Sequence, residues 1–304
     1  MVLYLVASGG NAGAGTNSAI EMAAVAGLST ALPASVTINE FSTIGAEWAL
    51  QQFTDAATGS VIGTSATNST GFSNAFNQLA ANLVDLGTGA PGALLESIAA
   101  SCGTGSPAVN CGGLEQMNTI ANILAACIAT SSGSTECTTL LSKATPPGGL
   151  TPLNTLGAAA DIARNPTNNV AALFALTSSG SPYTPALTSA PNDFSLALNF
   201  AQTSAGFSDP ARIALDAAGD VFVANEAGGV SDDGSVSELT AASGHNSGFR
   251  LFPPGSDFSE PFSLAVDESG NLWFANLEGS TVSELVGVAV PVTTPLKPGG
   301  PVLP

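Results

Sequence analysis

The sequence PARIALDAAGDVFVAN at residues 210–225 is matched without a gap by PFSLAVDESGNLWFAN at residues 261–276. A second match follows in each copy, because VSEL occurs at residues 236–239 and again at residues 282–285. Repetition of this kind indicates that one supersecondary unit is used twice along the chain.

Each copy predicts a strand, a tight turn, a returning strand, a loop and a third strand. In the first copy the turn is Asp216-Ala-Ala-Gly219, where the Asp side chain can bond its own downstream backbone and the Gly can take a positive φ. The copies differ in length only in the loop, where residues 226–235 correspond to residues 277–281. A period of roughly 40–50 residues with several short strands is typical of a β-propeller blade.

The pattern P-x-x-I-A-V-D-x-x-G-N-V-W-V-A-N followed by V-S-E-L resembles the NHL-type and virginiamycin B lyase-like propeller repeats of bacterial extracellular proteins. The resemblance covers about residues 208–288 and implies antiparallel blades, but it says little about activity because such blades serve many functions. Propellers typically have about four to eight blades, and this chain supplies about two. We therefore expect a ring that this chain alone does not close. The open blade edges would be covered by the N-terminal region or by another chain, for example in a homo-oligomer.

The chain as a whole is predicted to be α+β, with an N-terminal α-helical domain followed by antiparallel β-propeller-like blades. Apolar residues recur with helical spacing before the repeats, most clearly at Met117, Ile120, Leu124 and Cys127. This helical part is similar to the uncharacterised helical region of the same extracellular propeller proteins. We expect four divisions. Residues 1–33 would be a strand and loop left from an upstream β-sandwich, and residues 34–185 the helical domain. Residues 186–290 would form the blades, with a further strand near residues 194–200, and residues 291–304 a Pro-rich tail.

Composition restricts the partners. The chain has five Lys and Arg residues against 23 Asp and Glu, for a net charge of −18. This balance argues against nucleic acid and anionic membranes, both of which attract basic surfaces. No apolar stretch approaches the ~18–20 residues that a membrane helix needs, so we expect no membrane span. A protein or carbohydrate partner is compatible with the composition.

The four cysteines, Cys102, Cys111, Cys127 and Cys137, predict two disulfides. Three connectivities exist for four cysteines, and we favour Cys102–Cys111 with Cys127–Cys137 because each pair closes a short loop. No C-x-x-C pair occurs and the single His is far away, which argues against zinc. Disulfides indicate an oxidising compartment, so we expect a bacterial extracellular or cell-envelope protein. Residues 1–7 lack a basic region and read as a strand, so the export signal is expected upstream.

Few residues are candidates for chemistry. His245 lies in a predicted turn, and streptogramin lyases, which the repeats resemble, use a His base with a Glu-bound magnesium. Glu238 and Glu284 hold equivalent places in the two copies and are therefore interpreted as structural. The adjacent Asp232 and Asp233 are candidates for a magnesium or calcium ion, or simply solvate their loop. We assign no catalytic or metal-binding residue and expect no cofactor.

The sequence favours an extracellular or cell-surface protein that binds a partner or builds a surface structure without catalysis. The alternative is a metal-assisted lyase or hydrolase of the virginiamycin B lyase-like class. One His leaves little for general acid–base chemistry near neutral pH, and the axial pocket that propeller enzymes use needs a closed ring.

Overall fold

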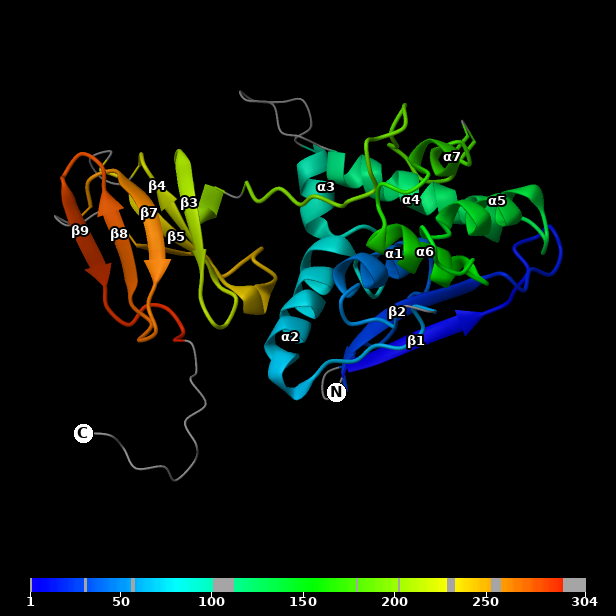
Figure 1. Ribbon diagram of the computed structural model, residues 1–304, viewed down its shortest axis with the longest axis horizontal. Helices are drawn as coiled ribbons and strands as arrows, with labels where there is room; N and C mark the ends of the chain where they lie inside the picture. The colour runs from blue at the N-terminus through cyan, green and yellow to red at the C-terminus, as the bar shows by residue number, and fades with distance from the viewer. Residues whose placement is uncertain are drawn as a thin grey trace. The chain divides into compact units, whose positions relative to one another are not determined.

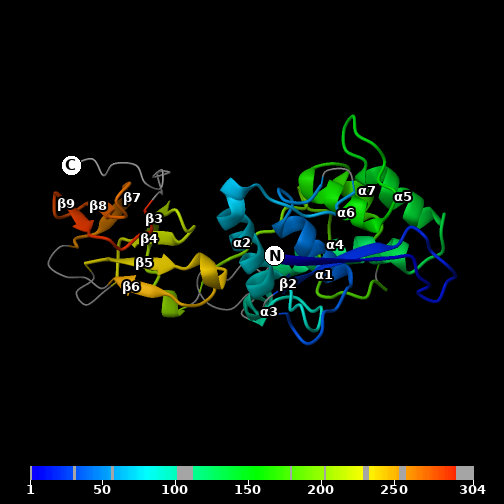
Figure 2. The same cartoon turned by 90° about the horizontal axis from the view of Figure 1, so that it is seen from below.

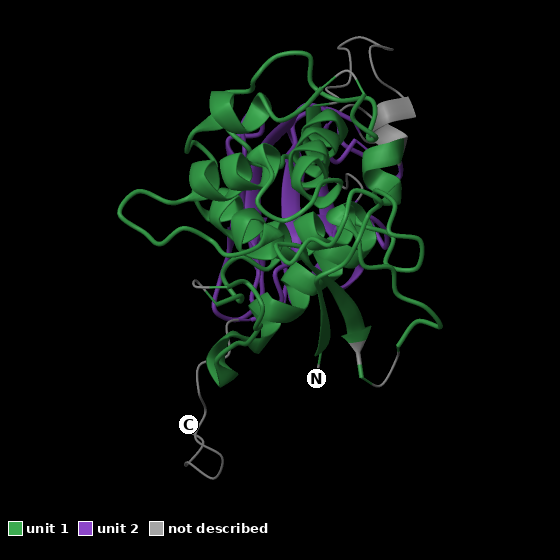
Figure 3. Ribbon diagram, turned by 90° about the vertical axis from the view of Figure 1, so that its right-hand side faces the viewer, with its two compact units in different colours: residues 1–199 green, residues 200–304 purple. Residues whose placement is uncertain are grey.

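The computed structural model contains both α-helices and antiparallel sheets, in agreement with the predicted α+β class. It describes residues 2–29, 32–55, 58–100, 112–178, 180–201, 203–228, 233–252 and 258–291. The chain divides into two compact units, unit 1 at residues 1–199 and unit 2 at residues 200–304 (Figure 3).

Unit 1 combines one β-hairpin with helices (Figure 1). The hairpin strands are β1 (Val2–Ser8) and β2 (Glu21–Leu28). The helices that the structure describes here are α1 (Glu40–Ala49), α2 (Ser69–Gln78), α3 (Ala93–Ala100), α4 (Gly112–Ile128), α5 (Thr135–Ala144), α6 (Thr155–Arg164) and α7 (Val170–Phe174), with short turns η1 (Ala66–Asn68) and η2 (Leu79–Leu83).

Side-chain caps fix where several of these helices begin. Asn39 forms a capping box with Ser42 at the start of α1, and each side chain bonds the other residue's backbone N–H. Asn154 accepts from the Gly157 N–H at the start of α6, 2.8 Å away. Asn and Ser are favoured at such positions because they satisfy N–H groups that the helix leaves unpaired.

The N-terminal strand does not stand alone, because residues 21–28 pair with it as β2, which the sequence did not predict. Ala23, Ala24 and Val25 are fully buried, so the segment lacks the alternation that marks a half-exposed strand. Helices α1 and α6 lie against β2 (Figure 1). Thr155 Oγ1 donates to the Glu21 carbonyl at 2.6 Å, which ties the hairpin to α6.

The core of unit 1 centres on α4, where Met117, Ile120, Leu124 and Cys127 are all buried along one stripe, as the helical spacing predicted. Residues 186–199, which we expected to begin the blade domain, also belong to this unit. They form no strand; instead Phe194 is fully buried in the unit 1 core. The Trp48 indole N–H donates to the Phe194 carbonyl at 2.8 Å.

Unit 2 consists of two antiparallel sheets that follow the two sequence copies. The first has the order β3 (Pro210–Leu215), β4 (Val221–Asn225), β5 (Ser235–Leu239), β6 (Arg250–Phe252). The second has the order β7 (Pro261–Val266), β8 (Leu272–Asn276), β9 (Thr281–Leu285). Strand β6, visible beside β5 in Figure 2, was not predicted from the sequence. Among the described residues the two sheets do not close into a ring.

The two copies agree in detail. Pro210 pairs with Asn225 and Pro261 pairs with Asn276, and each first strand has a bulge directly after its proline. The turn Asp accepts backbone N–H bonds two and four residues ahead in both copies. The repeated sequence therefore encodes one local structure twice, down to its turns.

The sheets stack on one another through a shared apolar cluster. Strand β7 lies against β3 and β4. The first sheet contributes Phe222, Val236 and Phe252, and the second contributes Leu272 and Phe274. Phe258, which precedes β7, stacks on Phe274 with ring centroids 4.7 Å apart. Burial of these side chains from water is the main stabilising contribution in unit 2.

Candidate functional site

His245 holds a turn in place between β5 and β6. Its backbone has a φ of +63°, and its N–H donates to the Thr240 carbonyl at 3.0 Å. Its Nε2 lies 3.0 Å from the Gly219 carbonyl in the β3–β4 turn, and its ring meets that of Phe200 edge-on. The imidazole thus links two turns of one sheet.

The two neighbouring acids are described only in part. Asp232 lies outside the described residues. The Asp233 side chain is exposed, and its backbone carbonyl accepts from the Glu260 N–H at 2.9 Å. These contacts tie His245 and Asp233 to different turns. Within the described residues no group of three or more His, Cys, Asp or Glu side chains is arranged to hold a metal ion.

Glu238 and Glu284 occupy equivalent register positions but different environments. Glu238 pairs across the sheet with Arg250, whose Nη1 is 3.8 Å from Oε2, and Glu238 is buried whereas Glu284 is exposed. Burial raises the pKa of Glu238; the Arg250 charge opposes that shift. Arg250 comes from β6, a strand that the second sheet lacks among the described residues.

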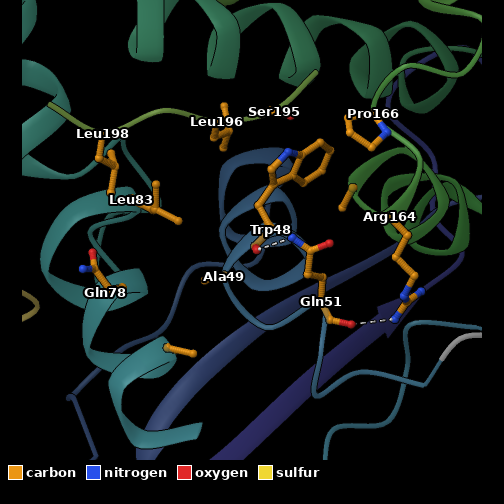
Figure 4. Close-up of a pocket in the computed structure, with 12 residues that line it drawn as sticks. Trp48, Ala49, Gln51, Gln78, Leu83, Arg164, Pro166, Ser195, Leu196 and Leu198 are labelled. Carbon is orange, nitrogen blue, oxygen red and sulfur yellow. Dashed lines mark hydrogen bonds between the residues drawn. The ribbon is translucent and has the colours of Figure 1, made fainter. Parts of the chain in front are cut away.

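A cavity of about 530 Å³ lies in unit 1 (Figure 4). It is lined by side chains from α1, the α2 region, the end of α6 and the 195–198 segment: Trp48, Ala49, Gln51, Ala75, Gln78, Leu83, Ala163, Arg164, Pro166, Ser195, Leu196 and Leu198. Apolar groups dominate the lining, and Arg164 is the one charged side chain among the described residues that line it. Such a cavity has the size and chemistry that could hold a small, mainly apolar molecule with one acidic group.

Arg164 is fixed by the loop that follows α1. Its Nη2 donates to the carbonyl oxygens of Thr54 at 3.0 Å, Asp55 at 3.1 Å and Gln51 at 3.4 Å; the last contact is drawn in Figure 4. Its Nη1 is buried without a hydrogen-bond partner among the described residues. The guanidinium therefore closes the loop and leaves one nitrogen uncommitted.

Behind this loop lies a buried carboxyl, Glu47 of α1. Burial raises the pKa of Glu47 from its usual 4.5 to about 8, and the hydrogen bond from Tyr4 and the Arg164 charge only partly offset that effect. The Tyr4 hydroxyl lies 2.9 Å from Glu47 Oε1 and 2.8 Å from the Gly59 carbonyl. Its single proton can serve only one of these acceptors, so a protonated Glu47 donating to Tyr4 satisfies all three groups.

Neither Glu47 nor Arg164 was singled out from the sequence. Two signals were available. Glu47 lies in the mostly apolar stretch of residues 44–50, between Ala46 and Trp48, and Arg164 is one of only five Lys and Arg residues in the chain. A charged residue within an apolar stretch predicts a buried charge that needs a polar partner. The sequence does not reveal which loop supplies that partner.

Cys127 and Cys137 form a disulfide that joins the end of α4 to α5, the pairing that the sequence favoured. Both residues are buried in the unit 1 core. The fully buried Asn17 amide donates to the Cys127 and Thr130 carbonyls, at 2.9 Å each, and so fixes the β1–β2 loop to this corner. Cys102 and Cys111 lie outside the described residues.

Comparison with protein-family models and with curated proteins finds no match to this chain. The helices that the structure describes include none with the length and apolar character required to span a bilayer.

Proposed function

We propose that this chain is an extracellular or cell-envelope protein that binds a protein or carbohydrate partner, or builds a surface structure, without catalysing a reaction. In this proposal the two sheets of unit 2 are blade-like repeats of the NHL type. The supporting observation is that the Asp and Asn side chains shared by the two copies bond the framework of the sheets.

The asparagines at the strand ends illustrate this use. Asn225 Nδ2 donates to Ser235 Oγ at 3.1 Å and Ser237 Oγ at 2.9 Å, and Oδ1 accepts from the Ser208 N–H. Asn276 makes the same three bonds, to Thr281, Ser283 and Ser259. A buried amide that is satisfied in this way closes the base of a loop.

Two further groups have similar roles. Asp216 and Asp267, which the copies share, complete the turns, and the single His245 bonds a backbone carbonyl. Such use favours a scaffold over an active site, because a reacting group needs a polar atom directed at substrate rather than at its own backbone. The buried Cys127–Cys137 disulfide supports an oxidising compartment.

Two measurements test the proposal. Fractionation of the producing cells with thiol blocking should find the protein outside the cytoplasm, with Cys127 and Cys137 oxidised. Streptogramin linearisation assays, with and without Mg²⁺, should give the same background rate for the wild type and for His245→Ala. A cytoplasmic protein with both thiols free would overturn the location, and activity that is lost in His245→Ala would establish the lyase alternative.

A further inference from the structure

The two sheets of unit 2 contact each other through opposite faces. The second sheet uses the side that bears Leu264, Leu272 and Phe274. In the first sheet, the residues equivalent to these are Ile213, Val221 and Val223, but they lie on the side away from the contact. The first sheet instead uses the side of Phe222 and Val236. The contact is therefore head-to-tail: two different faces of one repeated unit meet.

Each repeated unit consequently has two kinds of face. We call the side of Phe222 and Val236 the F face, which in the second sheet bears Trp273 and Val282. We call the side of Leu264 and Val266 the L face, which in the first sheet bears Ile213 and Leu215. The internal stack joins the F face of the first sheet to the L face of the second. One F face is left over, and so is the part of the first sheet's L face that bears Ile213 and Leu215. The rest of that L face is already covered, because the buried Ser237 donates to the Ala205 carbonyl.

The leftover faces carry apolar side chains that are exposed at positions where the other copy is buried. On the F face, Phe222 and Val236 have 0% of their surface exposed, whereas Trp273 has 39% and Val282 has 68%. On the L face, Leu264 and Val266 are half-buried in the shared cluster, whereas Ile213 has 64% exposed and Leu215 has 59%. These four positions are therefore covered in one copy and open in the other, whereas Val223 and Leu239 on the L face of the first sheet are themselves buried, with 6% and 4% of their surface exposed.

We propose that a second copy of this chain covers the open F face, placing its own Ile213 and Leu215 against Trp273 and Val282 of the first copy. The internal stack is the precedent, because it joins the same pair of faces with side chains of the same kind. The inference deepens the proposed function, on which it rests for treating the sheets as repeated units, by naming the partner. A contact of this type is heterologous, so each added copy presents a fresh open face, and growth ends only if the copies close into a ring.

Charge opposes this association and makes it dependent on salt. Each chain carries a net charge of −18, and among the described residues Glu284 on the open F face has no counterpart of the Arg250 that pairs with Glu238. Copies therefore repel at low ionic strength, and screening weakens that repulsion. We expect self-association of the full chain to strengthen as salt is raised.

The test is the mass of the full-length chain in solution, by sedimentation velocity over a range of concentrations at low and high salt. Val282→Lys places a charge on the open F face, and Ile213→Lys places one on the open L face. Each places a charge in the contact, so each should weaken association by roughly tenfold or more. Val61→Lys is the matched control, because Val61 is an equally exposed valine in unit 1 and should leave association unchanged. Circular dichroism and thermal unfolding check that each variant is folded.

Mixing the two interface variants distinguishes a heterologous contact from a symmetric one. The Ile213→Lys chain keeps an intact F face, and the Val282→Lys chain keeps an intact L face. Each alone should be monomeric, while the mixture should form a 1:1 dimer and nothing larger. Folded variants that associate like the wild type, a loss confined to one of the two variants, or a mixture that stays monomeric would each overturn the proposal.

A monomeric wild-type chain at high salt would also overturn it. If removal of residues 292–304 then made the chain associate, the C-terminal tail would be the occupant of the open F face. Export of such a monomer would leave the proposed extracellular function standing, so the two failures can be told apart.

Discussion

Asn225 and Asn276 end the second strand of each copy and bond it to the strand that follows. Both are buried, and each amide makes three hydrogen bonds to groups on two other segments. The hydroxyls and the N–H that bind each amide are also shielded from water. Without the amide these groups would be left without hydrogen-bond partners, so its loss would cost more than the bonds themselves.

Replacing Asn225 with Ala should lower the free energy of unfolding of unit 2 by about 2–4 kcal/mol, since it leaves a backbone N–H and buried hydroxyls without partners. Urea titration followed by circular dichroism measures the change. Glu278→Ala, at an exposed site in the same unit, should change it by less than about 0.5 kcal/mol. Equal effects of the two variants would refute the structural role of the amide.

Glu47 predicts a pH dependence of the stability of unit 1. Its pKa in the folded protein is raised to about 8, whereas the unfolded chain ionises it near 4.5. Unfolding therefore releases a proton between these values, and stability falls as pH rises from 4.5 to 8. Below pH 4.5 Glu47 is protonated in both the folded and the unfolded chain, so it contributes no further pH dependence.

Glu47→Gln should remove this part of the dependence. The difference in unfolding free energy between variant and wild type, measured by urea titration at several pH values, should grow in favour of the variant from pH 4.5 to 8 and then level off. Asp161, whose pKa burial raises to about 6, acts alike in both proteins and cancels in the difference. Glu136→Gln at an exposed site is the control. A difference that does not change with pH would contradict the assignment.

At this scale the sequence predicted residues whose roles are local. The Asp216 turn and the Gly219 that follows were predicted because Asx turns are set by neighbours within four residues. Glu47 and Arg164 were not foreseen, because their partners, Tyr4 and the Thr54 loop, are distant in sequence.

Among the elements, the α4–α5 corner depends on the Cys127–Cys137 disulfide, which closes a loop with a sequence separation of 10 residues. The Cys127→Ala/Cys137→Ala double variant should unfold more easily by about 2–4 kcal/mol, mainly because the unfolded chain gains freedom. Thermal or urea unfolding measures this. The gap should shrink under reducing conditions, where the wild type also loses the bond; a gap that persists would assign the effect to packing.

The turn between β7 and β8 is fixed by a close backbone contact. Gly270 has a φ of +83°, and a Cβ there would lie 2.4 Å from the Ala289 carbonyl oxygen. Gly287 has a φ of +66° with nothing within 4 Å of such a Cβ. The two glycines thus differ in crowding but share the left-handed backbone.

Gly287→Ala should cost about 1–2 kcal/mol for its backbone conformation alone. Gly270→Ala should cost about 1–3 kcal/mol more, because the added methyl displaces the chain that follows β9. Urea unfolding of the two variants against the wild type gives the comparison directly. Equal costs would mean that the Ala289 contact is not maintained in solution.

Elements with a clear period were predictable, and those without one were not. The α4 stripe was expected from its helical spacing, and the six repeat strands were expected from short apolar runs between turn residues that recur in both copies. Strand β2 was missed because it is buried on both faces, and β6 was missed because three residues carry too little pattern. Pairing with a neighbouring strand, rather than local preference, determines both.

For the molecule as a whole, the division falls after residue 199 rather than at residue 185. The Gly/Ser/Pro composition of residues 177–192 resembled a linker, but composition does not report that Phe194 fills a place in the unit 1 core. Phe194 lies beyond that stretch, and its partner, Trp48, is far earlier in the chain.

A fragment of residues 1–199 should therefore fold cooperatively by itself, whereas a fragment of residues 1–185 should be less stable by about 3–5 kcal/mol or more, the usual cost of removing a buried Phe. Urea unfolding of the two fragments measures the difference. Phe194→Ala in the longer fragment is the control and should reproduce much of the loss. Equal stability of the two fragments would place the boundary where the composition suggested.

The asparagine at the end of β4 has a consequence for what the fold can accommodate. Asn225 at the end of β4 bonds Ser235 at the start of β5, across the base of the loop, and also accepts from the Ser208 N–H before β3, so the base of the loop is held independently of the loop residues. Lengthening such a loop costs little, about 0.6 kcal/mol for each doubling. Extra residues inserted between Gly228 and Asp233 should therefore cost little stability, so this loop is a suitable position for grafting a foreign peptide.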